Sequence, residues 1–151
     1  MTEFDPATHR MVPQQRWFED FVVGERFVIP SRTMTSAVFA AFQTASGDTH
    51  PVHYDVEYCR RRGMPHLLAH GFQTLIHTAP GAGLFPFLVE ESLVGFLEQS
   101  SRFLKPVYAD DTLYPAVLGS VRQYTTIVNI IGSPLDLSLD WNVGLQHRSC
   151  I

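Results

Sequence analysis

The second half of the chain constrains the fold most, because four neighbouring segments there have the character of strands. Residues 93–107 carry no helical stripe, residues 111–121 follow an Asp-Asp turn signal, and residues 123–131 are rich in β-branched side chains. Residues 135–143, LDLSLDWNV, alternate apolar and polar side chains, which is typical of an antiparallel strand with one buried face. The pattern predicts an antiparallel sheet.

The first half predicts a strand followed by helices. Residues 26–35, RFVIPSRTMT, have strand character. The next segment, residues 36–46, has helical spacing of its apolar side chains, with a possible cap at Thr35 or Ser36 and a stop at Gly47. A short second helix is expected between an N-cap at Asp55 and Gly63.

A third helix is expected to begin near His70. Because the segment is mostly apolar, we expect this helix to be buried, with a kink or early stop near Pro80. The whole order is a strand, then helices with one very apolar member, then a run of strands, which is the α+β pattern of a sheet covering an apolar helix. The side chains expected on the buried side of this helix are Phe72, Leu75, Ile76 and Ala79.

Composition limits the class of protein. The chain has 151 residues, 45% of them hydrophobic and 17% charged, with a net charge of −4. It has no basic surplus for nucleic acid, no membrane-spanning apolar run, no secretory signal and only two cysteines. We therefore expect a cytoplasmic protein with a flexible tail at residues 1–15 and a single domain at residues 16–151.

The stretch ASGDTHPVHYD, residues 45–55, is the first candidate site. Asp48 and His53 lie five residues apart, and Pro51 stiffens the loop between them. A carboxylate and an imidazole held together suit general acid–base work or the binding of one water. The alternative is that Asp48 caps the following helix and His53 makes a local backbone bond.

A second polar island, LLAHGFQT, places His70 and Gly71 at the start of the apolar helix. The first turn of a helix leaves backbone N–H groups unpaired, and these can stabilise negative charge on a carbonyl oxygen. The alternative is that His70 only caps or packs.

Three blocks together resemble the MaoC-like dehydratases, the group of (R)-specific enoyl-CoA hydratases with the hot-dog fold. The blocks are FEDFVVGERF, ASGDTHPVHYDVEYCRRRGMPHLLAHG and SRFLKPVYADDTLYP, and they run in order from Phe18 to Pro115. The resemblance implies a curved antiparallel sheet wrapped around a central apolar helix. It fades beyond Val128, where residues 129–132 are a candidate hairpin turn.

The resemblance also implies the chemistry and the site. Asp48 and His53 would be the catalytic pair that adds water reversibly to a trans-2-enoyl thioester, giving an (R)-3-hydroxyacyl thioester. The Gly71 N–H would bind the thioester oxygen. One departure is His50, which stands where the family usually has Asn. The other residues implied at the oxyanion side, the loop and the substrate are His70, Ser46, Gly47 and His50.

The implied partners are an acyl-CoA or acyl-carrier thioester and a second copy of the chain, as a homodimer or a dimer of dimers. No cofactor is expected, since coenzyme A enters with the substrate. Two other functions stay open, a hot-dog thioesterase and a non-catalytic acyl-thioester-binding module. A functional metal is not expected, although five histidines are close in sequence: His50, His53, His66, His70 and His77.

Overall fold

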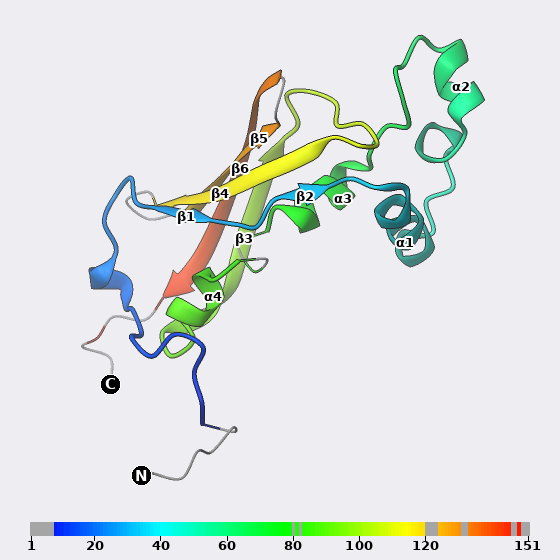
Figure 1. Cartoon of the computed structure of the whole chain (residues 1–151). Helices are drawn as coiled ribbons and strands as arrows, with labels where there is room; N and C mark the ends of the chain where they lie inside the picture. Colours follow the sequence, from blue (N-terminus) through cyan, green and yellow to red (C-terminus); the bar gives the residue numbers. More distant parts are fainter. Residues whose placement is uncertain are drawn as a thin grey trace.

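The protein is an antiparallel sheet with short helices on one face and a helical lobe at one end (Figure 1). The computed structural model describes residues 8–79, 81, 83–119, 124–130, 133–145 and 148. The sheet has the order β1-β4-β5-β6-β3, with β2 also paired to β4. The elements are η1 (Phe18–Asp20), β1 (Arg26–Val28), β2 (Arg32–Thr33), α1 (Ser36–Ser46), η2 (Pro51–His53), α2 (Val56–Arg61), α3 (Gly71–His77), α4 (Phe85–Leu88), β3 (Leu93–Arg102), β4 (Thr112–Gly119), β5 (Tyr124–Ile130) and β6 (Ser133–Leu145).

The four strands predicted in the second half are confirmed as β3 to β6. The hairpins β4–β5 and β5–β6 are antiparallel, and β6 returns to pair with β3 along most of its length. The chain beyond Val128 therefore completes the sheet. The proposed hairpin turn falls partly on residues 131–132, which lie outside the described residues.

The strand predicted over residues 26–35 is instead two short strands. β1 and β2 both pair with β4, and the segment between them contains Pro30. Proline has no N–H to give to a ladder, so it interrupts regular pairing. The Ile29 N–H still donates to the Pro115 carbonyl at 3.0 Å, so the backbone stays beside β4.

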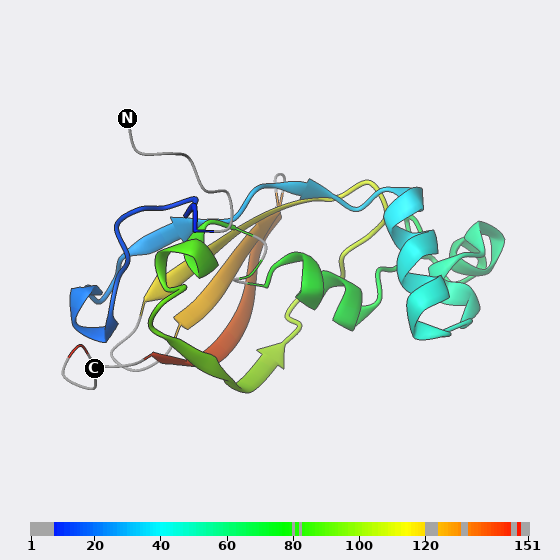
Figure 2. The same cartoon turned by 90° about the horizontal axis from the view of Figure 1, so that it is seen from below.

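The core lies on one face of β4. Leu113 and Val117 are fully buried and lie four residues apart, on the same side of the strand. Leu113 packs in a cluster with Leu75 of α3 and Phe39 of α1, whereas Val117 packs with Phe85 of α4. The two helices α3 and α4 therefore cover the same face of the sheet, as Figure 2 shows from below.

The expectation that Phe72 and Ile76 lie on the buried side of the third helix is wrong for this single chain. α3 has only seven residues and buries Gln73, Thr74 and Leu75. Phe72 and Ile76, predicted to face the core, are 72% and 53% exposed in this single chain. The reason is that α3 begins at Gly71 and turns its polar Gln73 inward toward His70. The predicted early stop is confirmed, because Thr78 is the C-cap.

The described part of the predicted tail is attached to the domain. Gln15 donates to the Val12 and Phe87 carbonyls, each at 2.8 Å, and its amide oxygen accepts from the Glu91 N–H at 3.2 Å. Arg10 forms an ion pair with Glu91. Within the described residues, none of the helices combines the length and apolar character that crossing a bilayer requires.

Candidate active site

The loop that carries Asp48 leaves α1 through a left-handed turn. Thr35 caps the start of the helix by accepting from the Val38 N–H at 3.4 Å, as predicted. Gly47 ends the helix with φ +70°, a conformation that favours glycine. The Ser46 hydroxyl then accepts from the Asp48 N–H at 3.2 Å. Ser46 and Gly47 thus set the direction of the chain just before the carboxylate.

Asp48 is half exposed and is held as an ionised carboxylate. Its Oδ1 accepts from the His50 N–H at 3.1 Å, and this bond is the main reason that the pKa of Asp48 is lowered from 3.8. The nearby imidazoles of His53 and His70 lower this pKa further, while partial desolvation opposes the shift. The other oxygen, Oδ2, lies 3.7 Å from His53 Nε2 and 3.6 Å from His70 Nε2.

His53 is positioned by the short η2 helix that Pro51 begins. The His50 Nδ1 accepts from the Val52 N–H at 3.3 Å and so caps this turn. The His53 Nδ1 then lies 2.6 Å from the Leu68 carbonyl oxygen, while the Leu68 N–H donates to the Val52 carbonyl at 3.0 Å. Leu68 therefore binds the loop through both of its backbone polar groups.

Burial keeps His53 neutral. Desolvation is the main cause that lowers the pKa of His53 from 6.5, and the Leu68 carbonyl opposes it. A carbonyl oxygen can only accept, so His53 carries its hydrogen on Nδ1 and presents a lone pair at Nε2. At neutral pH the loop thus pairs an ionised carboxylate with a neutral imidazole, the protonation states that a water-activating pair needs.

His70 completes the cluster. It is the N-cap residue of α3, and its side chain is 5% exposed. Its ring stacks on that of His53, with 3.5 Å between ring centroids and 20° between planes. The Phe42 ring centroid lies 4.9 Å from the His70 ring centroid. The cluster formed by Asp48, His53 and His70 therefore sits where the end of α1, η2 and the start of α3 meet.

Gly71 faces a cavity of about 320 Å³ next to this cluster. An added β-carbon at Gly71 would lie 3.1 Å from Phe103 Cζ, so the aromatic ring closes tightly over the glycine. Neither Asp48 nor His53 belongs to the cavity lining, but Leu68, whose carbonyl contacts His53 Nδ1, does. The lining residues are Leu68, Ala69, Gly71, Thr74, Phe103, Leu104, Lys105, Pro106 and Val107.

The remaining predicted site residue, His50, has an exposed side chain. Its ring centroid is 6.2 Å from that of His53 and 5.7 Å from that of Tyr58. Its backbone N–H, rather than its ring, supports Asp48.

Sequence reasoning missed Gln73, which is completely buried and contacts His70 through its amide oxygen. The signal was present: a glutamine three residues after an N-cap residue has the spacing of a capping box.

Of the five histidines that lie close in sequence, only His53 and His70 share a site with Asp48 among the described residues. His66 Nε2 lies 3.7 Å from an Asp110 carboxylate oxygen, so the pair His66 and His70 does not form a common site. One nitrogen each from His53 and His70 and one Asp48 oxygen lie within 4.8 Å of one another, close enough to consider a cation. However, the two rings are stacked, so their in-plane lone pairs run side by side rather than meeting at one tetrahedral centre.

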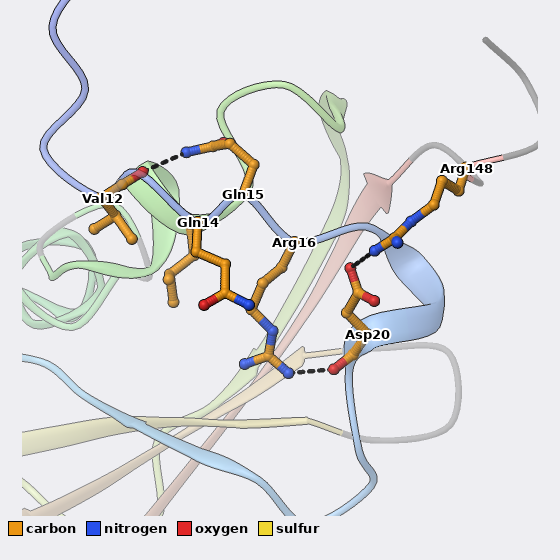
Figure 3. A pocket seen from close by; sticks show the side chains of 7 residues that line it. Val12, Gln14, Gln15, Arg16, Asp20 and Arg148 are labelled. Carbon is orange, nitrogen blue, oxygen red and sulfur yellow. Dashed lines mark hydrogen bonds and ion pairs between the residues drawn. The ribbon is translucent and has the colours of Figure 1, made fainter.

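A second cavity, of about 610 Å³, lies under the N-terminal segment (Figure 3). Asp20 lies between two arginines there: its backbone carbonyl accepts from Arg16, and its carboxylate binds Arg148. Arg16 also makes two bonds to the Glu25 carboxylate, at 2.6 and 2.8 Å. The charged groups around this cavity are therefore bound to one another. These bonds attach the N-terminal segment to the rest of the domain.

Solved structures share this fold. A monoamine oxidase regulatory protein from Archaeoglobus fulgidus aligns with a TM-score of 0.76 and 22% identity over 91% of this chain and 99% of that chain. The (R)-hydratase of A. caviae involved in PHA biosynthesis aligns with a TM-score of 0.68 and 24% identity, over 85% of this chain and 99% of that chain. R-hydratase PhaJ1 from Pseudomonas aeruginosa aligns with a TM-score of 0.70 and 17% identity, over 87% of this chain and 86% of that chain. At these identities the likeness defines the class of structure, and the predicted α+β hot-dog fold is confirmed.

The family follows from the sequence match. The model of the MaoC-like domain matches residues 20–130, most of the chain, including the cluster and the cavity. The chain therefore belongs to the MaoC-like domain family, as the three sequence blocks indicated. Among curated proteins, none matches the chain closely enough to count as a relative.

Proposed function

We propose that the protein is a hydro-lyase that adds water reversibly to the double bond of trans-2-enoyl thioesters, giving (R)-3-hydroxyacyl thioesters. The observation that carries the proposal is the pairing of an ionised Asp48 with a neutral His53, whose Nε2 lies 3.7 Å from Asp48 Oδ2. Membership of the MaoC-like family supports a hydratase or dehydratase reaction. The likeness to two (R)-hydratase structures is consistent with it.

In the hydration direction, a water held by Asp48 and His53 attacks the β-carbon of the enoyl group. A new bond forms between the water oxygen and the β-carbon, and one water proton passes to the Asp48–His53 pair. The electron pair of the double bond moves toward the thioester, giving an enolate-like oxygen. The pair then returns a proton to the α-carbon, so one water is consumed and the enzyme is unchanged.

The Gly71 N–H is the proposed donor to the thioester oxygen. The cavity beside Gly71 supports this assignment, because its lining is mostly apolar and suits an acyl or pantetheine chain. Preorganised donors of this kind lower the barrier by stabilising charge that develops only in the transition state. No cofactor is required for these steps, and coenzyme A or an acyl carrier enters with the substrate.

A homodimer is the proposed assembly. β3 is the last strand of the sheet order, so one of its edges presents unpaired backbone groups. Its side chains Val94 and Leu97 are exposed, as are Phe72 and Ile76 of α3. A second copy that pairs along β3 would cover both features by a twofold contact.

One assay separates the proposal from a thioesterase and from a binding module. The full chain is incubated with crotonyl-CoA and longer enoyl-CoAs, and loss of enoyl absorbance and release of free thiol are followed separately. We expect absorbance loss without thiol release. Thiol release would indicate a thioesterase, and binding without either change would indicate a binding module.

The matched variants are Asp48→Asn, which keeps the shape of the side chain, and His53→Gln, which replaces the imidazole with an uncharged polar side chain of similar length. Each should lower kcat by a factor of about 100 or more, the usual share of a general acid or base, while the circular dichroism spectrum stays that of the wild type. Full activity in either folded variant would refute the assignment of the catalytic pair.

A further inference from the structure

Gln73 is an unusual residue for its place in the fold. It is 0% exposed, on the inward face of α3 beside Leu75, where an apolar side chain would avoid desolvating an amide. Its Nε2 has no hydrogen-bond partner among the described residues. A buried amide that is only half satisfied destabilises the fold, so a glutamine at this position calls for another explanation.

The bonds to His70 identify the orientation of the Gln73 amide. The Gln73 Oε1 lies 3.3 Å from the His70 backbone nitrogen and 3.3 Å from His70 Nδ1. A backbone N–H can only donate, so the amide atom that faces it must be the oxygen and not the nitrogen. The same oxygen can only accept from the ring, which places the hydrogen of neutral His70 on Nδ1.

The consequence is a lone pair on His70 Nε2. This atom is buried, has no hydrogen-bond partner among the described residues, and lies 3.6 Å from Asp48 Oδ2. The Leu68 carbonyl imposes the same tautomer on the neighbouring His53. One carboxylate oxygen of Asp48 and one acceptor nitrogen each of His53 and His70 therefore lie within 4.8 Å of one another, on the same side of the stacked rings.

Building on the proposed function, we propose that Gln73 is a positioning residue: it fixes the tautomer of His70, so that His70 Nε2 accepts a hydrogen bond from the water that Asp48 and His53 activate. A water between these atoms donates both hydrogens and keeps its oxygen lone pairs available for the β-carbon. One proton passes to the Asp48–His53 pair. The other stays on the oxygen as the hydroxyl hydrogen of the product, held by His70 Nε2.

The test compares Gln73→Leu with Gln73→Glu and a matched control. Leucine removes the acceptor at similar volume, and glutamate keeps an acceptor oxygen but adds a charge. The control is Thr78→Val, because Thr78 is equally buried at the end of the same helix and its hydroxyl donates only to the Thr74 and Leu75 carbonyls. All variants are made in the full chain.

The first measurement is the histidine tautomer, by ¹⁵N NMR of the substrate-free protein. In the wild type we expect His70 to carry hydrogen on Nδ1; hydrogen on Nε2 would overturn the proposal without any variant. Gln73→Leu should give a mixture of tautomers or the opposite one, whereas Thr78→Val should keep the wild-type tautomer. Because this readout needs no substrate, it tests the positioning role even if the protein proves not to be a hydratase.

The second measurement is kinetics with crotonyl-CoA. Loss of an outer partner that orients a functional histidine costs about 10- to 100-fold in metalloenzymes, and we expect Gln73→Leu to lower kcat by a similar factor with little change in KM. Gln73→Glu keeps an acceptor oxygen for the His70 Nδ1–H and should therefore keep more of the activity than Gln73→Leu. Wild-type kcat in Gln73→Leu, or an equal loss in Thr78→Val, would overturn the proposal.

Discussion

Replacing Gly71 with alanine should separate activity from stability at the proposed oxyanion site. The new methyl group would meet the Phe103 ring at 3.1 Å from Cζ and 3.2 Å from Cε2, closer than an ordinary contact. Gly71 is not one of the described glycines with positive φ, so alanine can adopt its backbone conformation. The ring, which belongs to a half-exposed side chain, must therefore withdraw by a few tenths of an ångström.

The expected cost to folding is small. Overpacking a site costs about 1–3 kcal/mol, and the lower end applies because Phe103 can move toward solvent. Alanine is favoured over glycine in a helix by up to about 1 kcal/mol, which offsets much of this cost. The free energy of unfolding of Gly71→Ala should therefore stay within about 1 kcal/mol of the wild type.

The expected cost to activity is larger. The methyl group and the displaced ring occupy the side of Gly71 that faces the cavity, where the thioester is proposed to lie. A misplacement of about 1 Å can lower a rate by about 100-fold, and loss of one oxyanion donor costs about 100- to 1,000-fold. We expect kcat/KM to fall by about 100-fold.

The assay combines urea unfolding with steady-state hydration of crotonyl-CoA, for Gly71→Ala, Phe103→Leu and the double variant. Because the two side chains collide, the double variant should recover at least about tenfold of the lost activity. The reasoning is refuted if Gly71→Ala keeps wild-type kcat/KM, or if the double variant is no more active than Gly71→Ala.

Two further predictions concern stability and assembly. The pKa values of His53 and His77 are both lowered from 6.5, mainly by burial, so the unfolded chain binds protons more readily than the folded one as the pH falls. The stability that these neutral rings contribute is present above about pH 6.5 and is lost as the pH falls through their lowered pKa values. Urea unfolding should show this loss as the pH falls below about 6.5, and His77→Gln should show less of it. An identical loss in that variant would contradict the explanation. Leu97→Glu on the β3 edge should convert the proposed dimer to a monomer in analytical ultracentrifugation. The control is Val28→Glu, at an exposed position on β1 rather than β3, which should leave the dimer intact. A dimer that survives Leu97→Glu would show that β3 is not the interface.

Local signals in the sequence were enough to locate much of the fold and to name the three residues of the cluster, although not how His70 lies against His53. Caps and breakers fix α1 between Thr35 and Gly47, and an alternating pattern fixes β6. Asp48 and His53 were identifiable because Pro51 and the surrounding motif act over only a few residues. Such features depend on neighbours in the chain, and a single sequence contains them.

Other features depend on contacts that a local pattern does not specify. His70 was expected at the oxyanion side, but its stacking on His53 requires two loops to meet across seventeen positions. Apolar periodicity suggested that Phe72 would be buried, and the short α3 helix instead turns Gln73 inward. Helical periodicity carries no information about whether another molecule covers the exposed apolar side of α3.

The backbone of Leu68 has a consequence for how the cavity beside Gly71 can diversify. Its N–H and its carbonyl hold the η2 loop and His53, while the residue also lines the cavity beside Gly71. Any amino acid other than proline supplies the same two backbone groups. The cavity wall at this position can therefore change in size or polarity without displacing His53, so in the proposed hydratase the substrate preference could vary at a single residue while the geometry of the Asp48–His53 pair stays the same.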